Sequence, residues 1–264
     1  MIRFWLTHRV YALFIGFIFF AFGLPGAYGQ TSPIGIDVIQ PKTIRIGSFF
    51  SGEKVTVRAV VPFGNQVALR LVGPREDLVL MKKGRVGGLW MNVEQIHFQN
   101  LPKVYLLWTS GKLASLEAGG GLKTMPLDYA SFLSGTLQGK NRAEEPLLLQ
   151  ELIKMKEADN LYQIVEGTVR IKPLETGVWD QADAVLEVPS KIYPGTYALE
   201  LIGFKEGQGR LLHSSPLVVK LVGFPALVSN LALQKGLLYG ILAVIIATFS
   251  GLLIGIVFTS KGGH

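Results

Sequence analysis

LLYGILAVIIATFSGLLIGIVF, residues 237–258, is a run of 22 residues without a charged side chain, and it decides the architecture of the chain. A helix rises ~1.5 Å per residue, so a helix of this length matches the ~30 Å hydrocarbon core of a bilayer. The stretch predicts a membrane-spanning helix within a stem and transmembrane segment at 225–259. A cytoplasmic tail is expected at 260–264.

Small residues recur along this predicted helix at spacings of three or four. At about 100° per residue they form one slowly drifting stripe, along which a second helix could approach closely. We expect this helix-packing stripe to meet a membrane protein partner or a second copy of the chain. Because glycine and alanine are common in membrane helices, a plain anchor in the lipid bilayer is the alternative. The stripe comprises Gly236, Gly240, Ala243, Ala247, Gly251 and Gly255.

The first residues, 1–29, have the pattern of a secretory signal peptide. Arg3 and Arg9 precede an apolar core at 10–24, and small residues stand at −3 and −1 before Gln30. Cleavage is expected after Gly29, with an uncleaved anchor as the alternative. In both cases the two arginines keep the N-terminus in the cytoplasm. The body is then expected in the periplasm and the C-terminal helix in the inner membrane.

Composition agrees with a bacterial periplasm. The chain has no cysteine and no Asn-x-Ser/Thr sequon. Without cysteine there is no disulfide framework, c-type haem, iron–sulfur ligation or thiolate zinc. The net charge is +7, or +5 without Arg3 and Arg9, and the charges are scattered. The single basic cluster at 82–85 is expected to be a solvated turn, so no nucleic-acid partner is predicted.

The exported body is predicted to be mainly β, with an Ig-like β-sandwich as its first module at 30–117. Residues 54–60, KVTVRAV, alternate apolar and polar side chains with β-branched residues at period two. Many short strands with turn signals every eight to twelve residues are typical of a sandwich. Strands are expected at 43–50, 54–60, 66–72, 78–82, 88–92, 95–98 and 104–109.

A glycine-rich link and two helices are predicted at 118–160. Thr124 can cap the first helix, with Pro126 in its opening turn, and the second runs over 144–158. Strands return at 161–224, where we expect a second, smaller β module. These strands could instead complete the sheets of the first module. They are expected at 163–171, 184–188, 196–204 and 211–222.

Residues with catalytic or ligand-binding chemistry are sparse. His97 and His213 stand in different predicted modules, with no paired-histidine spacing. Met81 and Met91 would allow a soft copper site, although core methionine is the ordinary interpretation. The chain has no Gly-x-Ser-x-Gly and no phosphate-binding loop. The sequence therefore predicts no catalytic residues, no cofactor, no metal and no enzymatic activity.

Three tryptophans offer a different hint. Trp90, Trp108 and Trp179 could form a platform for a carbohydrate or a partner protein. A tryptophan buried in the sandwich is the more common interpretation of each.

Several short motifs, taken in order, resemble the Alph_Pro_TM family of alphaproteobacterial transmembrane proteins. The family carries a Gly-Pro element, a basic turn leading into Gly-[Ile/Leu]-Trp-x-Asn, and an aromatic-Pro-aromatic stretch. The similarity spans nearly the whole mature chain. The matching positions are 73–74, 82–92, 98, 101–105, 161–162, 194–197, 220–224 and 238–243. The chain departs from the family pattern in its glycine-rich link at 119–121 and its low-charge membrane flank.

The resemblance implies a function without a known reaction. The family has no established biochemical activity, and its members are often encoded beside TauE/SafE-type sulfite or organosulfonate exporters. It implies a membrane-anchored periplasmic accessory protein that assists such an exporter. A periplasmic module that binds a small anion or a metal near the membrane is the alternative.

Overall fold

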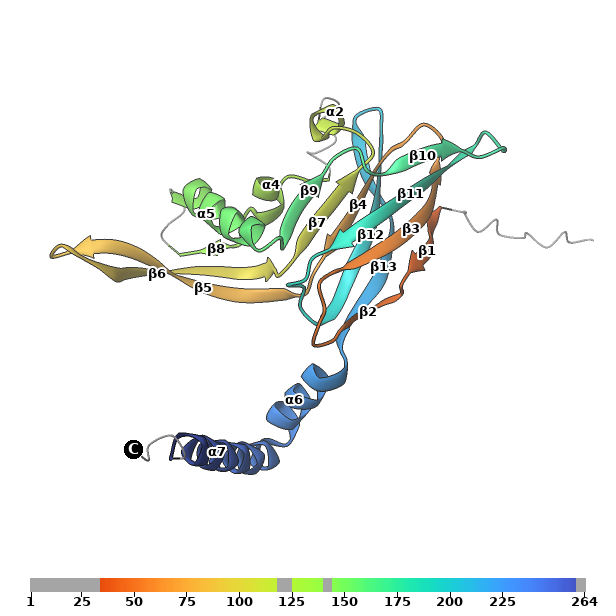
Figure 1. Ribbon diagram of the computed structural model, residues 1–264. Helices are drawn as coiled ribbons and strands as arrows, with labels where there is room; N and C mark the ends of the chain where they lie inside the picture. Colours follow the sequence, from red (N-terminus) through yellow and green to blue (C-terminus); the bar gives the residue numbers. More distant parts are fainter. Residues whose placement is uncertain (1–33, 118–124, 140–143, 260–264) are drawn as a thin grey trace, which may run out of the picture. The chain divides into compact units, whose positions relative to one another are not determined.

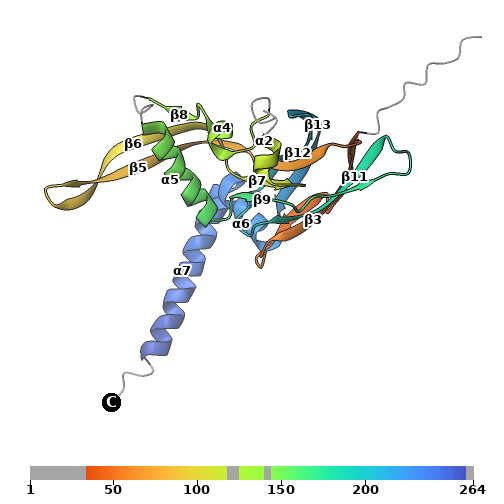
Figure 2. The same cartoon turned by 90° about the horizontal axis from the view of Figure 1, so that it is seen from above.

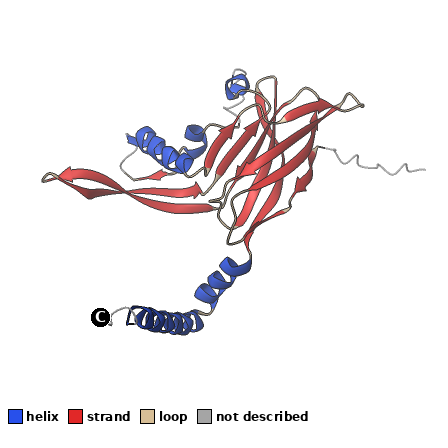
Figure 3. Cartoon of the chain, viewed as in Figure 1, coloured by secondary structure: helices blue, strands red, loops and turns tan. Residues whose placement is uncertain are grey.

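The computed structural model describes residues 34–117, 125–139 and 144–259 (Figure 1). The predicted signal peptide, the glycine-rich link at 119–121, the expected cap Thr124 and the cytoplasmic tail lie outside the described residues. Strands dominate the described part of the chain, and helices occupy one insertion and the C-terminal end (Figure 3). The coarse prediction of a mainly β protein with one C-terminal apolar helix is confirmed.

Two sheets form the body. The first, sheet A, is antiparallel, with strand order β1-β3-β11-β10. Its strands are β1 (Gly35–Gln40), β3 (Glu53–Pro62), β11 (Trp179–Val188) and β10 (Arg170–Pro173). The second, sheet B, is mixed, with order β2-β13-β12-β4-β7-β9 and parallel pairs at β2–β13 and β7–β9. Its strands are β2 (Thr43–Ile46), β13 (Gln208–Leu221), β12 (Gly195–Lys205), β4 (Gln66–Val72), β7 (Tyr105–Thr109) and β9 (Tyr162–Val165).

A third sheet, sheet C, is built on a long hairpin that extends beyond the other two sheets (Figure 1). It joins β5 (Arg75–Val86) to β6 (Leu89–Pro102), and the short β8 (Leu137–Gln138) pairs with β6. The sequence predicted three short strands here, but the structure has two long ones. Two bulges absorb the irregular alternation that suggested breaks.

Among the described residues, three helices lie between β7 and β9, in a segment that we call the insertion (Figure 2). The longest, α5 (Glu145–Ala158), has Pro146 in its first turn and agrees with the prediction. The short α4 (Tyr129–Leu133) begins later than expected, because Asp128 accepts the capping hydrogen bond from Ser131 N. A further short helix, α2 (Leu113–Glu117), lies at the end of the predicted first β module, where the sequence predicted no helix.

The burial patterns of β3 and β4 identify the layers. In β3 every second residue is buried, as in a sheet with one face in water. In β4 all residues from Val67 to Val72 are buried, so both faces of sheet B are covered there. Leu69 pairs with Trp108 on one face, whereas Arg70 on the other face reaches Pro126 of the insertion. Sheet B is therefore the middle layer between sheet A and the helical insertion.

The strands at 161–224 do not form a separate β module. Over its whole length β11 pairs with β3, and β12 pairs with β4, so both sheets combine strands from the two predicted modules. The structure follows the alternative, in which the later strands complete the first module's sheets. A segment of about sixty residues buries too little surface for a core of its own.

Two helices follow the last strand without a linker. The first, α6 (Gly223–Gln234), ends at Lys235, and α7 (Gly236–Thr259) begins at the next residue. Lys235 leaves the helical conformation, with φ −132° and ψ 49°. The sequence analysis predicted one membrane-spanning helix and a stem at 225–259, and it did not predict α6 as a separate helix. A continuous helix of both lengths would be much longer than a ~30 Å hydrocarbon core, whereas α7 alone suffices.

The interleaved sheets predict that the first half of the body cannot fold alone. A fragment of residues 34–160 retains β3 and β4 but loses β11 and β12, and this exposes the apolar faces of both strands. We expect it to lack a cooperative thermal transition in circular dichroism, whereas a fragment of residues 34–222 shows one. A sharp transition in the shorter fragment would restore the two-module organisation.

Candidate functional site

The predicted helix-packing stripe lies along α7. All six of its residues, Gly236 to Gly255, fall within this helix. A Cβ atom added at Gly236, Gly240 or Gly251 would meet no atom within 4 Å. On this side the described part of the chain therefore leaves room for another helix.

The helix itself fits a membrane. Residues Gly236–Ile256 have a mean hydropathy of 2.4 and none of the window is buried, and this is the one candidate span in the described ranges. The hydroxyl of Thr248 donates to the carbonyl oxygen of Val244 at 2.9 Å, so this polar group is satisfied within the helix. α6 is also uncharged and leaves Phe224 and Leu233 largely exposed.

The tip of the β5–β6 hairpin is a second exposed surface, which the sequence analysis missed. We define the hairpin tip as residues 83–93. Its turn, Gly87-Gly88, has φ values of 58° and 87°, the conformation of a tight type I′ hairpin. Leu89 and Trp90 are 69% and 68% exposed, and the guanidinium of Arg85 lies 5.7 Å from the centre of the Trp90 ring. The signal in the sequence was the Gly87-Gly88 pair, which follows the basic cluster at 82–85. The sequence analysis interpreted this cluster as a solvated turn.

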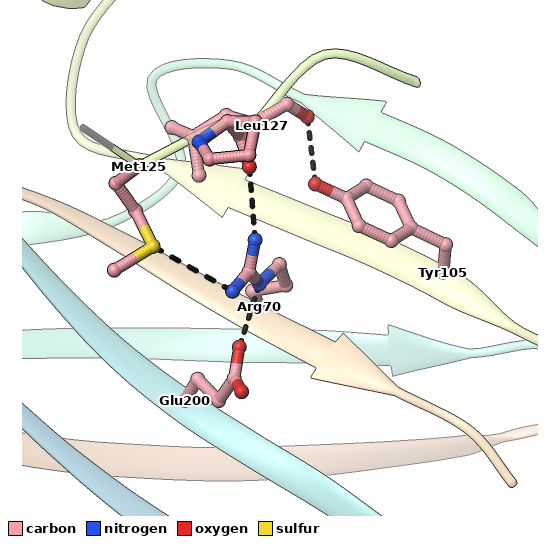
Figure 4. A network of polar contacts seen from close by, with 6 residues as sticks. Arg70, Tyr105, Met125, Leu127 and Glu200 are labelled. Atoms are coloured by element: carbon pink, nitrogen blue, oxygen red, sulfur yellow. Dashed lines mark hydrogen bonds and ion pairs between the residues drawn. The ribbon is translucent and has the colours of Figure 1, made fainter. Parts of the chain in front are cut away.

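An ion pair within sheet B has an arginine that also contacts the insertion (Figure 4). Arg70 Nε lies 2.6 Å from Glu200 Oε2, and their side chains are 7% and 19% exposed. Arg70 Nη1 donates to the carbonyl oxygen of Pro126 at 2.9 Å, and Arg70 Nη2 approaches the sulfur of Met125 at 3.7 Å. The guanidinium also lies 4.8 Å from the centre of the Phe132 ring. Because these contacts surround its guanidinium, Arg70 attaches the insertion to sheet B and is not available to bind a ligand.

Tyrosines continue this attachment. The hydroxyl of Tyr105 donates to the carbonyl oxygen of Leu127 at 2.6 Å, and that of Tyr162 donates to Pro102 at 2.8 Å. The rings of Tyr105 and Tyr129 meet edge to face at 5.7 Å. Burial raises the pKa of the Tyr105 and Tyr162 phenols, so both stay neutral hydrogen-bond donors.

The residues considered for metal chemistry do not converge. His97 is exposed in the hairpin, whereas His213 lies in β13 with its Nε2 3.1 Å from Ser215 Oγ. The pairing register places Met81 and Met91 on opposite faces of the hairpin. Among the residues that the structure describes, no three His, Asp or Glu side chains group as metal ligands.

The three tryptophans also lie apart. Trp108 is 2% exposed and belongs to the core, as the buried interpretation expected. Trp179 begins β11 in sheet A, and Trp90 is on the hairpin tip. A joint tryptophan platform is therefore not formed.

A shallow hollow on sheet A carries mixed charge. It is lined by Thr56, Arg58, Thr168, Arg170 and Asp183, among others. Arg58 Nε donates to Asp183 Oδ1 at 2.9 Å, and Gln181 donates to the other oxygen of Asp183. Burial alone would raise the pKa of Asp183, but the hydrogen bonds from Arg58 and Gln181 hold it below its usual value.

The fold and its surfaces define a mainly β protein with one candidate membrane-spanning helix. Residues 36–260 match the family model described as "Putative transmembrane protein (Alph_Pro_TM)", and the chain belongs to this family. The resemblance noted in the sequence is thereby confirmed. No curated protein and no solved structure gives a match.

The Arg70–Glu200 pair predicts a large difference between two arginines. Arg70→Leu leaves Glu200 buried without its partner and should lower the free energy of unfolding by about 3–5 kcal/mol. Arg58→Leu breaks a pair whose side chains are 50% and 28% exposed and should cost about 1 kcal/mol or less. Chemical denaturation of the full chain in detergent, followed by circular dichroism, measures both. Equal losses would show that Arg70 does not fasten the insertion.

Proposed function

We propose that this protein is a single-span, membrane-anchored accessory protein that holds a β body beside an integral membrane partner. The observation that carries the proposal is α7, an apolar helix with open small-residue positions, joined to a tightly packed β body through α6. Close helix approach at glycine and alanine favours association within a membrane. Among the described residues, no group of His, Asp or Glu side chains is arranged to hold a metal ion.

The proposed location is the bacterial inner membrane, with the β body in the periplasm and the C-terminus in the cytoplasm. The support is the pattern of the first 29 residues, with Arg3 and Arg9 before an apolar core. The absence of cysteine and of glycosylation sequons supports the same compartment. The proposed partner is a TauE/SafE-type sulfite or organosulfonate exporter, and the support for it is the family resemblance.

We also propose that sheets A and B are an Ig-like sandwich with a long insertion. The order β1-β3-β11-β10 corresponds to strands A-B-E-D, and β13-β12-β4 corresponds to G-F-C. On this assignment everything from β5 to β9 enters between strands C and D. This longer segment, β5 to β9, therefore contains both the hairpin tip and the helices that Arg70 attaches to sheet B.

A second candidate function is the binding of a small anion. The hollow on sheet A supports it, because Arg58, Arg170 and two threonine hydroxyls line one depression. Asp183 counts against anion binding, because its carboxylate already accepts a hydrogen bond from Arg58. This candidate therefore stands behind the accessory role.

The packing role predicts that enlarging the stripe weakens association. Gly240→Leu with Gly251→Leu would fill the open side of α7 and should reduce both self-association and copurification with membrane proteins. Leu242→Phe with Leu253→Phe adds bulk on the opposite side and is the matched control. Crosslinking in membranes and affinity purification from solubilised membranes measure the two effects. Unchanged association in both assays would leave α7 as a plain anchor.

If the hollow on sheet A binds an anion, titrating that anion into the protein should give a measurable heat of binding. Calorimetry of the full chain in detergent against sulfite, an alkyl sulfonate, phosphate and copper should show binding of an anion that Arg58→Ala with Arg170→Ala abolishes. Lys54→Ala with Lys191→Ala removes two cations that do not line the hollow and should leave the heat unchanged. No heat from any of the four compounds would remove this candidate.

A further inference from the structure

The hairpin tip is exposed on both of its faces and has an unusual composition. Val86, Leu89, Trp90 and Met91 are between 50% and 69% exposed and gather around the Gly-Gly turn. Residues 83–93 contain a lysine and an arginine but no acidic residue. An apolar cluster with a cationic border of this kind marks a binding surface rather than an ordinary solvated turn.

Apolar side chains lie on both faces of the hairpin tip, whereas the two cations, Lys83 and Arg85, lie on one face. The pairing Val86–Leu89 comes first, then Arg85–Trp90, then Gly84–Met91 and finally Lys83–Asn92. Paired residues share a face, so Trp90 lies on one face and Leu89 and Met91 lie on the other. A protein groove would contact mainly one face of a strand pair. A lipid surface surrounds an inserted tip and contacts both.

We propose that the hairpin tip inserts shallowly into a bilayer surface that contains anionic phospholipids. Tryptophan is enriched at the level of lipid headgroups, and lysine and arginine near the membrane are attracted to anionic lipids. Lys83 and Arg85 would contact phosphates while Leu89, Trp90 and Met91 enter the boundary with the acyl chains. Insertion stays shallow, because unpaired backbone groups at the turn need water or headgroups as partners.

The helices α6 and α7 keep the hairpin tip close to the bilayer. The bilayer surface is therefore the binding partner that the tip meets most often. β13 continues into α6 without a linker, and α6 has 12 residues, about 18 Å at the usual helical rise. With α7 in the membrane, the β body cannot leave the neighbourhood of the surface. This attachment therefore gives the lipid surface a high effective concentration at the tip. The proposal requires α7 to be an anchor but not to pack against another helix.

The absence of cysteine allows a direct test in the full chain. A single Leu89→Cys, labelled with an environment-sensitive dye, is placed in nanodiscs of phosphatidylcholine with phosphatidylglycerol. The reference is Val185→Cys, which is 51% exposed on sheet A. We expect a blue shift and loss of emission to nitroxide lipids at Leu89→Cys, and neither at Val185→Cys. An unshifted dye that aqueous iodide quenches equally at both sites would overturn the proposal.

Charge variants distinguish whether the lipid surface or a protein contact shields the dye from water. Lys83→Glu with Arg85→Glu should abolish the blue shift, whereas Lys172→Glu with Arg210→Glu changes the net charge equally and should not. Pure phosphatidylcholine nanodiscs should weaken the shift as well. Protection that persists in both cases, but rises with the number of chains per disc or with added membrane proteins, would assign the tip to protein contacts and overturn the lipid proposal. The Gly240→Leu, Gly251→Leu variant should keep the shift, so failure of the helix-packing role is measured separately.

Discussion

The cross-strand ion pair between Arg70 and Glu200 is the contact on which the layered arrangement depends. It joins β4 to β12, so it lies at the position where the early and late parts of the chain meet in one sheet. The same guanidinium holds the Pro126 carbonyl and packs on Phe132. A buried charge is costly unless it is fully hydrogen-bonded. Only the arrangement with sheet and insertion both in place meets that requirement.

A fixed insertion has a consequence for the hairpin. The base of the hairpin packs against the core through Ile96, Phe98 and Leu101 of β6, which are all buried. Lys82 reaches Glu144 at the start of α5 at 2.7 Å, so the insertion also supports the hairpin midway. The contacts raise the pKa of Lys82, whose hydrogen bond with Glu144 favours the charged form. Beyond Lys82 the pairing of β5 with β6 holds the hairpin tip together. The base of the hairpin is held by the core and by the contact between Lys82 and Glu144.

Much of the fold could be read from local pattern, and the remainder could not, for a physical reason. Strand β4 matched its predicted bounds, 66–72, because a short apolar run between two turn signals is a local feature of the sequence. One partner of β3 and one of β4, β11 and β12, lie more than a hundred residues away, and pairing at that distance leaves no periodicity in the sequence. Arg70 was missed for the same reason, since a lone arginine in a strand gives no sign of Glu200. The α7 stripe was visible because all six residues share one helix.

An exposed apolar hairpin is an aggregation hazard for a freely diffusing protein, because unpaired strand edges and apolar patches recruit other chains. Here several features reduce that hazard without removing the apolar side chains. Two bulges interrupt the regular edge of the hairpin, and Lys83 and Arg85 repel a second copy of the same tip. A membrane anchor confines each chain to a surface and limits the encounters between edges. Features that prevent self-association while keeping Trp90 and Leu89 exposed are consistent with a contact that the chain makes with something other than itself.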